Sequence, residues 1–233
     1  MAGSVAESTS KGLPPAWASW AKVDVPAQTG IVRPLLAAVP PGGLPRMVAC
    51  GWLSPAAADV MGVALAVFKG VDNFQDFVDK PGANVVQVAS REAKRLGITE
   101  GMPGDEALRL LETAPPTEEE AATTKDASES QMKVQRTASE SHAAFDGWTT
   151  AELAVSTGLP KPLLVAVPPG EKPRMAACGW IDPETADKLG VSLVVFKGVG
   201  QFRDFVVEVG ATSNVVKATS KAAEELGIVA GIL

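Results

Sequence analysis

The chain carries two copies of one sequence. The octapeptide PRMVACGW at Pro45–Trp52 returns as PRMAACGW at Pro173–Trp180, 128 positions later. Between Pro34 and Val78 about two-thirds of the residues match those 128 positions on, and further downstream the offset becomes 130. Solenoid repeats run to roughly 20–50 residues, whereas each copy here is long enough to fold alone. The sequence therefore predicts a duplicated domain, with repeat 1 over residues 13–112 and repeat 2 over residues 145–233.

The stretch between the copies, residues 113–144, differs in composition. It is poor in large apolar residues, rich in Glu, Ser, Thr and Ala, and net acidic. This composition predicts a disordered acidic linker. The linker contains RTAS, in which Arg136 precedes Ser139 by three positions, a spacing typical of basophilic kinase substrates. Ser139 is therefore a candidate phosphorylation site.

Each copy has the turn and helix-cap signals of a mixed α/β unit. In copy one the apolar runs PLLAAV and RMVACGWL, separated by PPGGLP, predict a β-hairpin. Ser54 or Asp182 followed by proline, with Gly62 or Gly190 behind, predicts a short helix. The run VALAVFK predicts a buried strand. The next run, NVVQVASREAKRLG, is compatible with one helix, or with a strand to about Ala89 and a helix capped by Ser90.

The predicted fold class is therefore α/β of the α+β type. It comprises two tandem homologous units, each β-hairpin–helix–strand–helix–helix, joined by the acidic linker.

The octapeptide itself predicts a central strand. Both alternating faces of RMVACGW are apolar, so we expect a strand covered on both sides, with Cys50 and Cys178 buried. Two cysteines are too few for a disulfide framework. Buried thiols are the main interpretation, and a disulfide between the copies or a reactive thiol are the alternatives. A reducing intracellular compartment fits best.

Composition excludes several classes of protein. The formal net charge is −6 and the pI is about 5.0, so general nucleic-acid binding is not expected. No apolar run approaches the roughly 20 residues of a membrane span, and the N-terminus has no apolar signal core. We expect a soluble intracellular protein, with an organelle lumen left open if a targeting peptide is missing.

The scarcity of proton-transferring side chains disfavours catalysis. The one histidine, His142, lies in the predicted linker, and tyrosine is absent from the chain. This removes Ser–His and Cys–His pairs and histidine metal sites from the repeats. We predict no catalytic residue and no metal site, leave any cofactor unknown, and consider an enzyme less favoured than a non-enzyme.

One segment resembles a known family. The run VASREAKRLGITEGMPGDEALRL, Val88–Leu110, is similar to the part of Y-family translesion DNA polymerases that holds the phosphates of the incoming nucleotide. The resemblance implies phosphate contacts at Arg91 and Lys94. The metal-binding carboxylates of that family have no counterpart here. Copy two carries Glu224 and Glu225 where copy one has Lys94 and Arg95, so the unit does not require a nucleotide.

Six residues are candidates for binding, all of them kept in both copies. Lys69 and Lys197 each precede a glycine after a strand, an arrangement that suits an anion as well as a plain turn. Arg46 and Arg174 begin a strand, where a salt bridge and a partner contact are comparable interpretations. Trp52 and Trp180 suit the core, or an exposed anchor for a partner or an apolar ligand.

Two functions follow from this sequence. We favour a non-catalytic tandem-repeat interaction or scaffold protein, such as an accessory subunit of a larger assembly, because two linked units can grip two sites on one partner. The alternative is a small-ligand-binding protein that takes an anion such as a nucleotide, or an apolar molecule.

Overall fold

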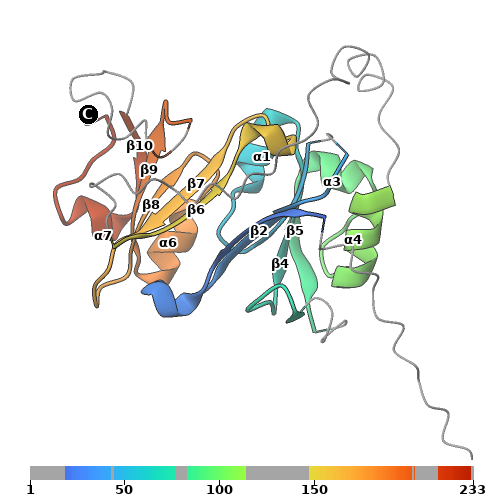
Figure 1. The fold of residues 1–233 in the computed structure, drawn as a ribbon, viewed down its shortest axis with the longest axis horizontal. Helices are drawn as coiled ribbons and strands as arrows, with labels where there is room; N and C mark the ends of the chain where they lie inside the picture. Colours follow the sequence, from blue (N-terminus) through green and yellow to red (C-terminus); the bar gives the residue numbers. More distant parts are fainter. Residues whose placement is uncertain are drawn as a thin grey trace, which may run out of the picture.

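The fold is of mixed α/β type and contains two five-stranded sheets (Figure 1). The structure, a computed structural model, describes residues 19–42, 45–76, 83–113, 147–200, 202 and 215–231. Repeat 1 forms one sheet in the order β1-β2-β3-β4-β5, and repeat 2 forms the other in the order β10-β9-β8-β7-β6. The spatial order of the strands follows the chain in both sheets. The predicted linker, Thr113 apart, lies outside the described residues.

The strands of the two sheets correspond one to one. In repeat 1 they are β1 (Ala21–Val25), β2 (Leu35–Val39), β3 (Arg46–Cys50), β4 (Ala64–Lys69) and β5 (Val85–Ala89). In repeat 2 they are β6 (Thr149–Leu153), β7 (Leu163–Val167), β8 (Arg174–Cys178), β9 (Ser192–Lys197) and β10 (Val215–Thr219).

The helices are short. Repeat 1 contains α1 (Pro55–Met61), α3 (Arg91–Arg95) and α4 (Gly104–Thr113), and repeat 2 contains α6 (Pro183–Leu189) and α7 (Lys221–Glu224). A 3-10 turn follows the first strand of each repeat, η2 (Ala27–Thr29) and η5 (Val155–Thr157).

The pairing of the strands agrees with the predicted hairpin. β2 and β3 are antiparallel, as are β7 and β8. β3 and β4 are parallel, and α1 makes the crossover between them, since parallel strands cannot be joined by a tight turn. β5 and β10 then return antiparallel at the outer edge of each sheet.

The predicted helix boundaries are confirmed by their caps. The Ser54 hydroxyl accepts a hydrogen bond from the amide of Ala57, and the Asp182 carboxylate accepts one from the amide of Glu184. Gly62 and Gly190 end the helices at φ of 67° in both cases. A left-handed residue of this kind costs glycine little because it has no Cβ.

The ambiguous run of copy one is a strand followed by a helix. β5 ends at Ala89, and Ser90 is the N-cap of α3. The Ser90 hydroxyl is completely buried, donates to the carbonyl of Val63 at 2.7 Å and accepts from the amide of Leu65 at 2.8 Å. Ser220 makes the equivalent two bonds in repeat 2. This serine therefore fixes the last strand of each sheet to the start of the strand beside it.

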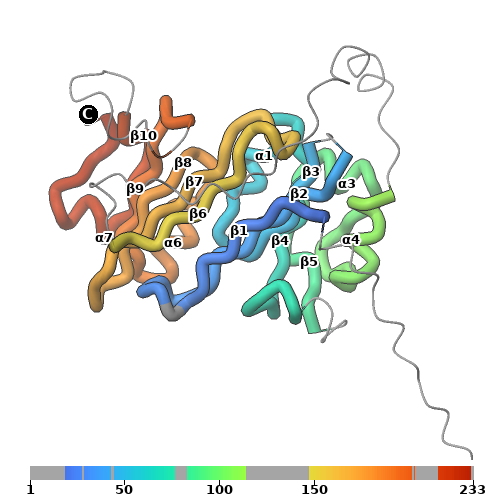
Figure 2. The backbone as a smooth tube through the Cα atoms, in the orientation of Figure 1, coloured from blue at the N-terminus to red at the C-terminus, as the bar shows by residue number. Residues whose placement is uncertain are grey.

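The predicted order of elements omitted a strand at the start of each unit, and the described part of repeat 2 lacks the predicted last helix. β1 and β6 are edge strands that pair with β2 and β7. They also lie against each other and bring the two sheets together (Figure 2).

The expectation of a strand covered on both sides holds in repeat 1 and is wrong in repeat 2. Every residue of β3 is buried. In β8 the side chain of Arg174 is exposed and Ala176 is only half-buried. The difference arises because α4 covers one face of the first sheet, where Arg46 donates to the carbonyl of Leu111 at 2.6 Å.

Within the described residues, no helix is long and apolar enough to cross a membrane.

Candidate ligand site between the repeats

The two repeats meet at the end of the octapeptide. Leu53 and Ile181 form an antiparallel bridge. The amide of Ser54 donates to the carbonyl of Trp180 at 2.8 Å, and the amide of Asp182 donates to the carbonyl of Trp52 at 2.8 Å. These bonds are reciprocal, so each repeat makes the same contact with the other. The arrangement is that of a two-fold dimer built within one chain.

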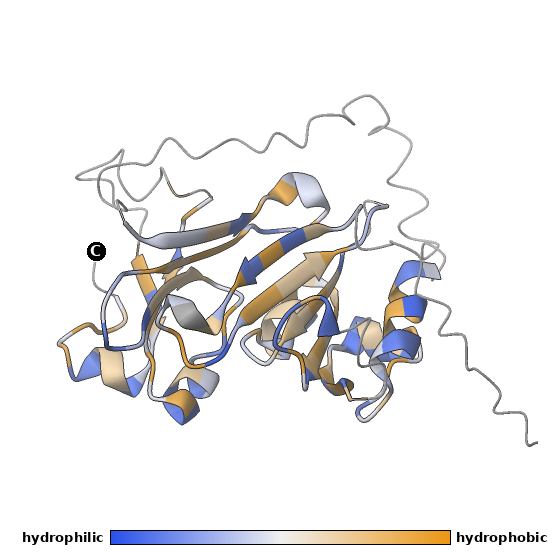
Figure 3. Cartoon of the chain, turned by 60° about the horizontal axis from the view of Figure 1, so that its bottom comes forward, coloured by the Kyte–Doolittle hydropathy of each residue, from blue (hydrophilic) through white to orange (hydrophobic). Residues whose placement is uncertain are grey.

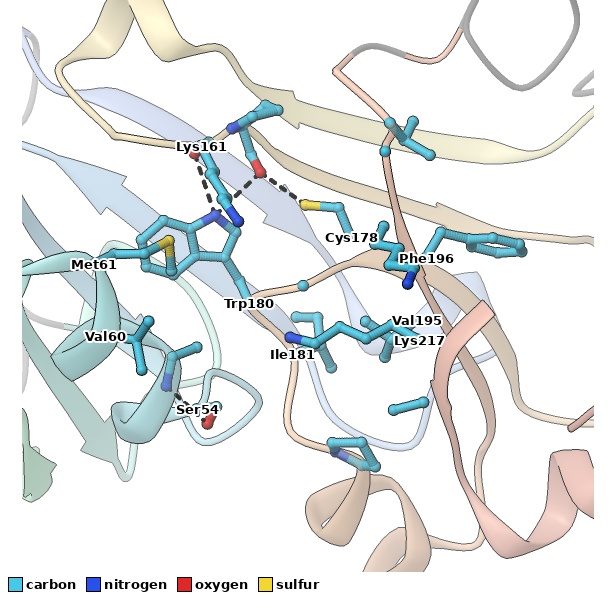
Figure 4. Close-up of a pocket in the computed structure, with 18 of the residues that line it drawn as sticks. Ser54, Val60, Met61, Lys161, Cys178, Trp180, Ile181, Val195, Phe196 and Lys217 are labelled. Carbon is cyan, nitrogen blue, oxygen red and sulfur yellow. Dashed lines mark hydrogen bonds between the residues drawn. The ribbon is translucent and has the colours of Figure 1, made fainter. Parts of the chain in front are cut away.

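A cavity of about 830 Å³ lies beside this contact. One wall is helix α1 of repeat 1, and the remainder belongs to repeat 2 (Figure 4). Repeat 1 contributes Ser54, Ala56, Ala57, Val60 and Met61, and the central lining residues of repeat 2 are Lys161, Cys178, Trp180, Ile181, Lys197 and Lys217.

The α1 wall is apolar although it faces solvent. Val60 is 88% exposed, the highest value among the exposed large hydrophobic residues that the structure describes. Met61 is partly buried and lies next to the indole of Trp180 in Figure 4. An exposed valine beside a hollow is apolar surface that a ligand can cover.

The floor of the cavity is rigid. Trp180 is 1% exposed, and its indole Nε1 donates to the carbonyls of Lys161 at 3.2 Å and Pro162 at 3.0 Å. The Cys178 thiol donates to the same Pro162 carbonyl at 2.7 Å and accepts from the amide of Leu164 at 3.2 Å. These bonds hold the indole and the thiol in fixed positions before any ligand arrives, which lowers the entropic cost of binding.

Both thiols have low nucleophilic reactivity. Burial raises the pKa of Cys178 from 9.0 to about 11, and burial raises the pKa of Cys50 to the same value. Both cysteines are free rather than joined in a disulfide. Because the thiolate is the reactive form, neither side chain is poised as a nucleophile near neutral pH. The predicted burial of the cysteines is confirmed.

The charge around the cavity has one sign. Lys161, Lys197 and Lys217 line it, and none of its described lining residues is Asp or Glu. A Cβ added to Gly179 would lie 3.5 Å from the Lys217 ammonium, so that ammonium lies close over the backbone at the cavity floor. Three lysines beside an apolar floor favour an anion, since Coulomb attraction strengthens where protein replaces water.

Several corresponding positions of the two repeats differ at this cavity. Helix α6 occupies in repeat 2 the place that α1 has in repeat 1. Lys188 of α6 corresponds to Val60 of α1, and Glu184 corresponds to Ala56. On the sheet, Gln87 of repeat 1 corresponds to Lys217 of repeat 2. The cavity described here therefore combines an apolar helix with a cationic sheet edge, a combination that its counterpart does not repeat.

The structure places the six predicted binding residues in different environments. Trp180 and Lys197 line the cavity. Trp52 is 1% exposed in the core, where its Nε1 donates to the carbonyl of Pro34 at 3.1 Å. Lys69 is exposed at the end of β4, Arg46 is buried beneath α4, and Arg174 is exposed. The candidate phosphorylation site Ser139 lies outside the described residues.

The segment that resembles the polymerase family lies away from the cavity. Arg91 and Lys94 are exposed on helix α3, and Lys94 forms an ion pair with Glu100 at 3.9 Å. Neither residue lines the cavity. Within the described part of the chain, no group of His, Cys, Asp and Glu residues has the arrangement of a metal site.

Comparison with known proteins assigns no activity to the chain. A family model described as a domain of unknown function, DUF1805, matches residues 49–111, within repeat 1. One solved structure, that of a protein of unknown function, TA1206, from Thermoplasma acidophilum, is 28% identical over 36% of this chain and 71% of that chain, with a TM-score of 0.28. No curated protein matches. The chain is thus similar over part of its length to proteins whose descriptions name no ligand or reaction.

Proposed function

We propose that this protein binds a small organic anion with an apolar body in the cavity between its repeats. The observation that carries the proposal is the pairing of an exposed apolar helix with three lysines around one hollow. The volume of about 830 Å³ lies within the roughly 300–1,000 Å³ that is usual for small-molecule sites. The apolar body would cover Val60 and Met61, and the anionic group would face the lysines.

The chemistry of the lining favours binding over catalysis. General acid–base catalysis needs a side chain that titrates near the working pH. The described lining contains no His, Asp or Glu. Its one thiol is held protonated by a pKa of about 11. The lysines supply fixed positive charge, which suits recognition of a carboxylate, sulfonate or phosphate.

A pair of matched fluorescent probes tests this function. Anilinonaphthalene sulfonate has an apolar ring system and one anionic group, and N-phenyl-naphthylamine has the same rings without the charge. We expect the sulfonate to bind once per chain and more tightly than the neutral probe. Replacing Lys197→Gln or Lys217→Gln should weaken the sulfonate by about threefold to tenfold each, the range of a partly exposed ion pair, and leave the neutral probe unchanged.

The duplicated sequence supplies the controls. Lys69 has the same sequence context as Lys197 but does not line the cavity, so Lys69→Gln should leave both affinities unchanged. Val60→Ser should weaken both probes, whereas Lys188→Ser, at the equivalent position of α6, should weaken neither. Equal losses in Lys69→Gln and Lys197→Gln would show that the sulfonate responds to net charge alone, and the proposal would then be wrong.

The interaction or scaffold role expected from the sequence rests on a different observation. Repeat 2 exposes a sheet face that repeat 1 covers with a helix. A tandem-repeat protein that binds a partner through that face is the second candidate function, and the face shares Phe196 with the lining of the cavity.

A further inference from the structure

Helix α4 is the cover of one face of the first sheet. It contacts β3, β4 and β5, and its buried residues Gly104, Ala107, Leu108 and Leu111 recur at helical spacing. Its remaining positions are mostly exposed, so hydrophobic and hydrophilic residues alternate along it (Figure 3). At its C-terminal end the carbonyl of Leu111 accepts from the Arg46 guanidinium at 2.6 Å.

The same face of the second sheet is open. The described part of repeat 2 ends at Gly231, whose amide donates to the carbonyl of Val216 at 2.9 Å, as the equivalent Gly101 does to Val86 at 2.8 Å. No described residue of repeat 2 occupies the place of α4. Five positions of β3 and β4 that are buried in repeat 1 are half-buried or exposed at the equivalent places of repeat 2: Arg46 and Arg174, Val48 and Ala176, Ala64 and Ser192, Ala66 and Val194, Phe68 and Phe196.

These five positions share one face of the sheet. The registers pair Arg174 with Ser192, Ala176 with Val194, and Cys178 with Phe196, and paired residues of neighbouring strands point to the same side. The intervening residues of β8 and β9 are buried in both repeats. Within β8 and β9 the loss of burial therefore affects the α4 face alone.

The loop beside this face is also apolar and exposed. Leu226 is 55% exposed and Val229 is 47% exposed, two of the large hydrophobic residues most open to solvent in the described chain. Leu96, which corresponds to Leu226, is partly buried, and Ile98 is completely buried in repeat 1, whereas Ile228 is half-buried in repeat 2. The apolar surface is thus continuous from the sheet into the loop.

We propose that this open face of repeat 2, formed by Ala176, Val194, Phe196, Leu226 and Ile228, docks an amphipathic helix of a partner protein. The helix has the pattern of α4, with small and leucine side chains on one stripe. Its C-terminal carbonyls lie at Arg174, as those of α4 lie at Arg46, since a cation suits the negative end of a helix. Helix α4 on repeat 1 is thus the template for the kind of helix that we propose and for the direction in which it runs.

Residues 1–18 and 114–146 do not carry the leucine pattern of α4. Residues 1–18 and 114–146 contain one leucine between them, Leu13, which two prolines follow. Neither segment can supply a stripe equivalent to Leu108 and Leu111. In a second copy of the chain, α4 is already seated on its own repeat. These two segments and a second copy are therefore not the proposed occupant.

A synthetic helix with the α4 sequence is the direct probe. A peptide of residues 102–113, held helical by a hydrocarbon staple between the exposed positions 105 and 109, is titrated into the full chain and followed by fluorescence anisotropy. We expect saturable binding of one peptide per chain. A peptide with Leu108→Asp and Leu111→Asp should bind at least tenfold more weakly, and Val194→Asp in the protein should have the same effect.

Two further variants keep the test decisive. Arg174→Glu changes an exposed side chain and leaves the fold intact, and it should weaken the peptide at least threefold. Lys69→Gln, at an exposed position of repeat 1 that does not line the cavity, should not alter it. Equal affinity for the two peptides, or binding that Arg174→Glu and Val194→Asp leave unchanged, overturns the proposal. So does a wild-type dimer in sedimentation that Val194→Asp dissociates, because the occupant is then a second copy. Peptide binding that appears only after deletion of residues 114–146 also overturns it, because that segment is then the occupant.

Discussion

Replacing Trp180 with alanine is expected to lower the free energy of unfolding by about 3–5 kcal/mol and to abolish ligand binding. The stability loss has the size measured for buried aromatic side chains, because Trp180 is 1% exposed and its removal leaves a cavity. A loss of this size is a large part of the roughly 5–15 kcal/mol that stabilises a typical protein. Binding is lost because the indole is the floor of the ligand site.

Trp52 is the matched control for this prediction. It is buried to the same degree and donates the equivalent hydrogen bond, but it does not line the cavity. Trp52→Ala should therefore cost a similar free energy of unfolding, measured by denaturant titration, and retain binding of anilinonaphthalene sulfonate at a temperature where both variants are folded. If both tryptophan variants lose binding equally, the tryptophan is needed only for folding.

Alkaline pH should destabilise the protein through its two cysteines. Burial raises the pKa of each thiol from 9.0 to about 11 in the folded state. The unfolded chain therefore releases its thiol protons first, and stability falls as the pH rises from about 9 to about 11. Below pH 9 the contribution is fully present. Each thiol should account for a loss on the order of 2–3 kcal/mol, which denaturant titrations at a series of pH values will measure.

The double variant Cys50→Ala and Cys178→Ala isolates this effect. All other ionisable groups are the same in both proteins, so the difference between the two pH profiles belongs to the thiols. The Pro34 carbonyl that accepts from Cys50 keeps the indole of Trp52 as a donor. We expect a flatter decline in the double variant. Identical declines would mean that the cysteines do not carry the pH dependence.

Local signals made the helix boundaries and the hairpin predictable. Helices α1 and α6 each begin at a proline that follows a serine or aspartate, and each ends before a glycine seven residues after that proline. Capping and backbone geometry alone determine these boundaries. The edge strands β1 and β6 were missed. In β1 only Val23 and Val25 are buried, charged residues alternate with them, and the strand pairs with β2 along one side only. Tertiary pairing of this kind leaves little trace in a local pattern.

The site was harder to predict than the fold because it joins distant parts of the chain. Trp180 and Lys197 were identified as candidates because both copies keep them. Lys161, Lys217 and Val60 were missed, since the cavity depends on the bridge between Leu53 and Ile181. None of the three is identical in the two copies, where Arg33, Gln87 and Lys188 stand at the corresponding positions. Comparison of the copies identifies what the fold requires, whereas the site depends on what differs.

The contrast between Arg46 and Arg174 shows the same limit. The two residues have the same neighbours in sequence, yet one is buried beneath α4 and the other is exposed. No property of the octapeptide distinguishes them. The difference comes from helix α4, which lies more than fifty residues from Arg46 along the chain.

The central claim is that the two repeats form one body with the ligand cavity at their contact. The most direct test is to place a cleavage site for a sequence-specific protease between residues 114 and 146, cut the folded chain, and measure its mass by size-exclusion chromatography with light scattering. The contacts at Leu53, Ile181, β1 and β6 predict that the two fragments co-elute at the 24.0 kDa of the intact chain, plus the inserted site. Two fragments that elute separately, each at its own mass, would contradict the account.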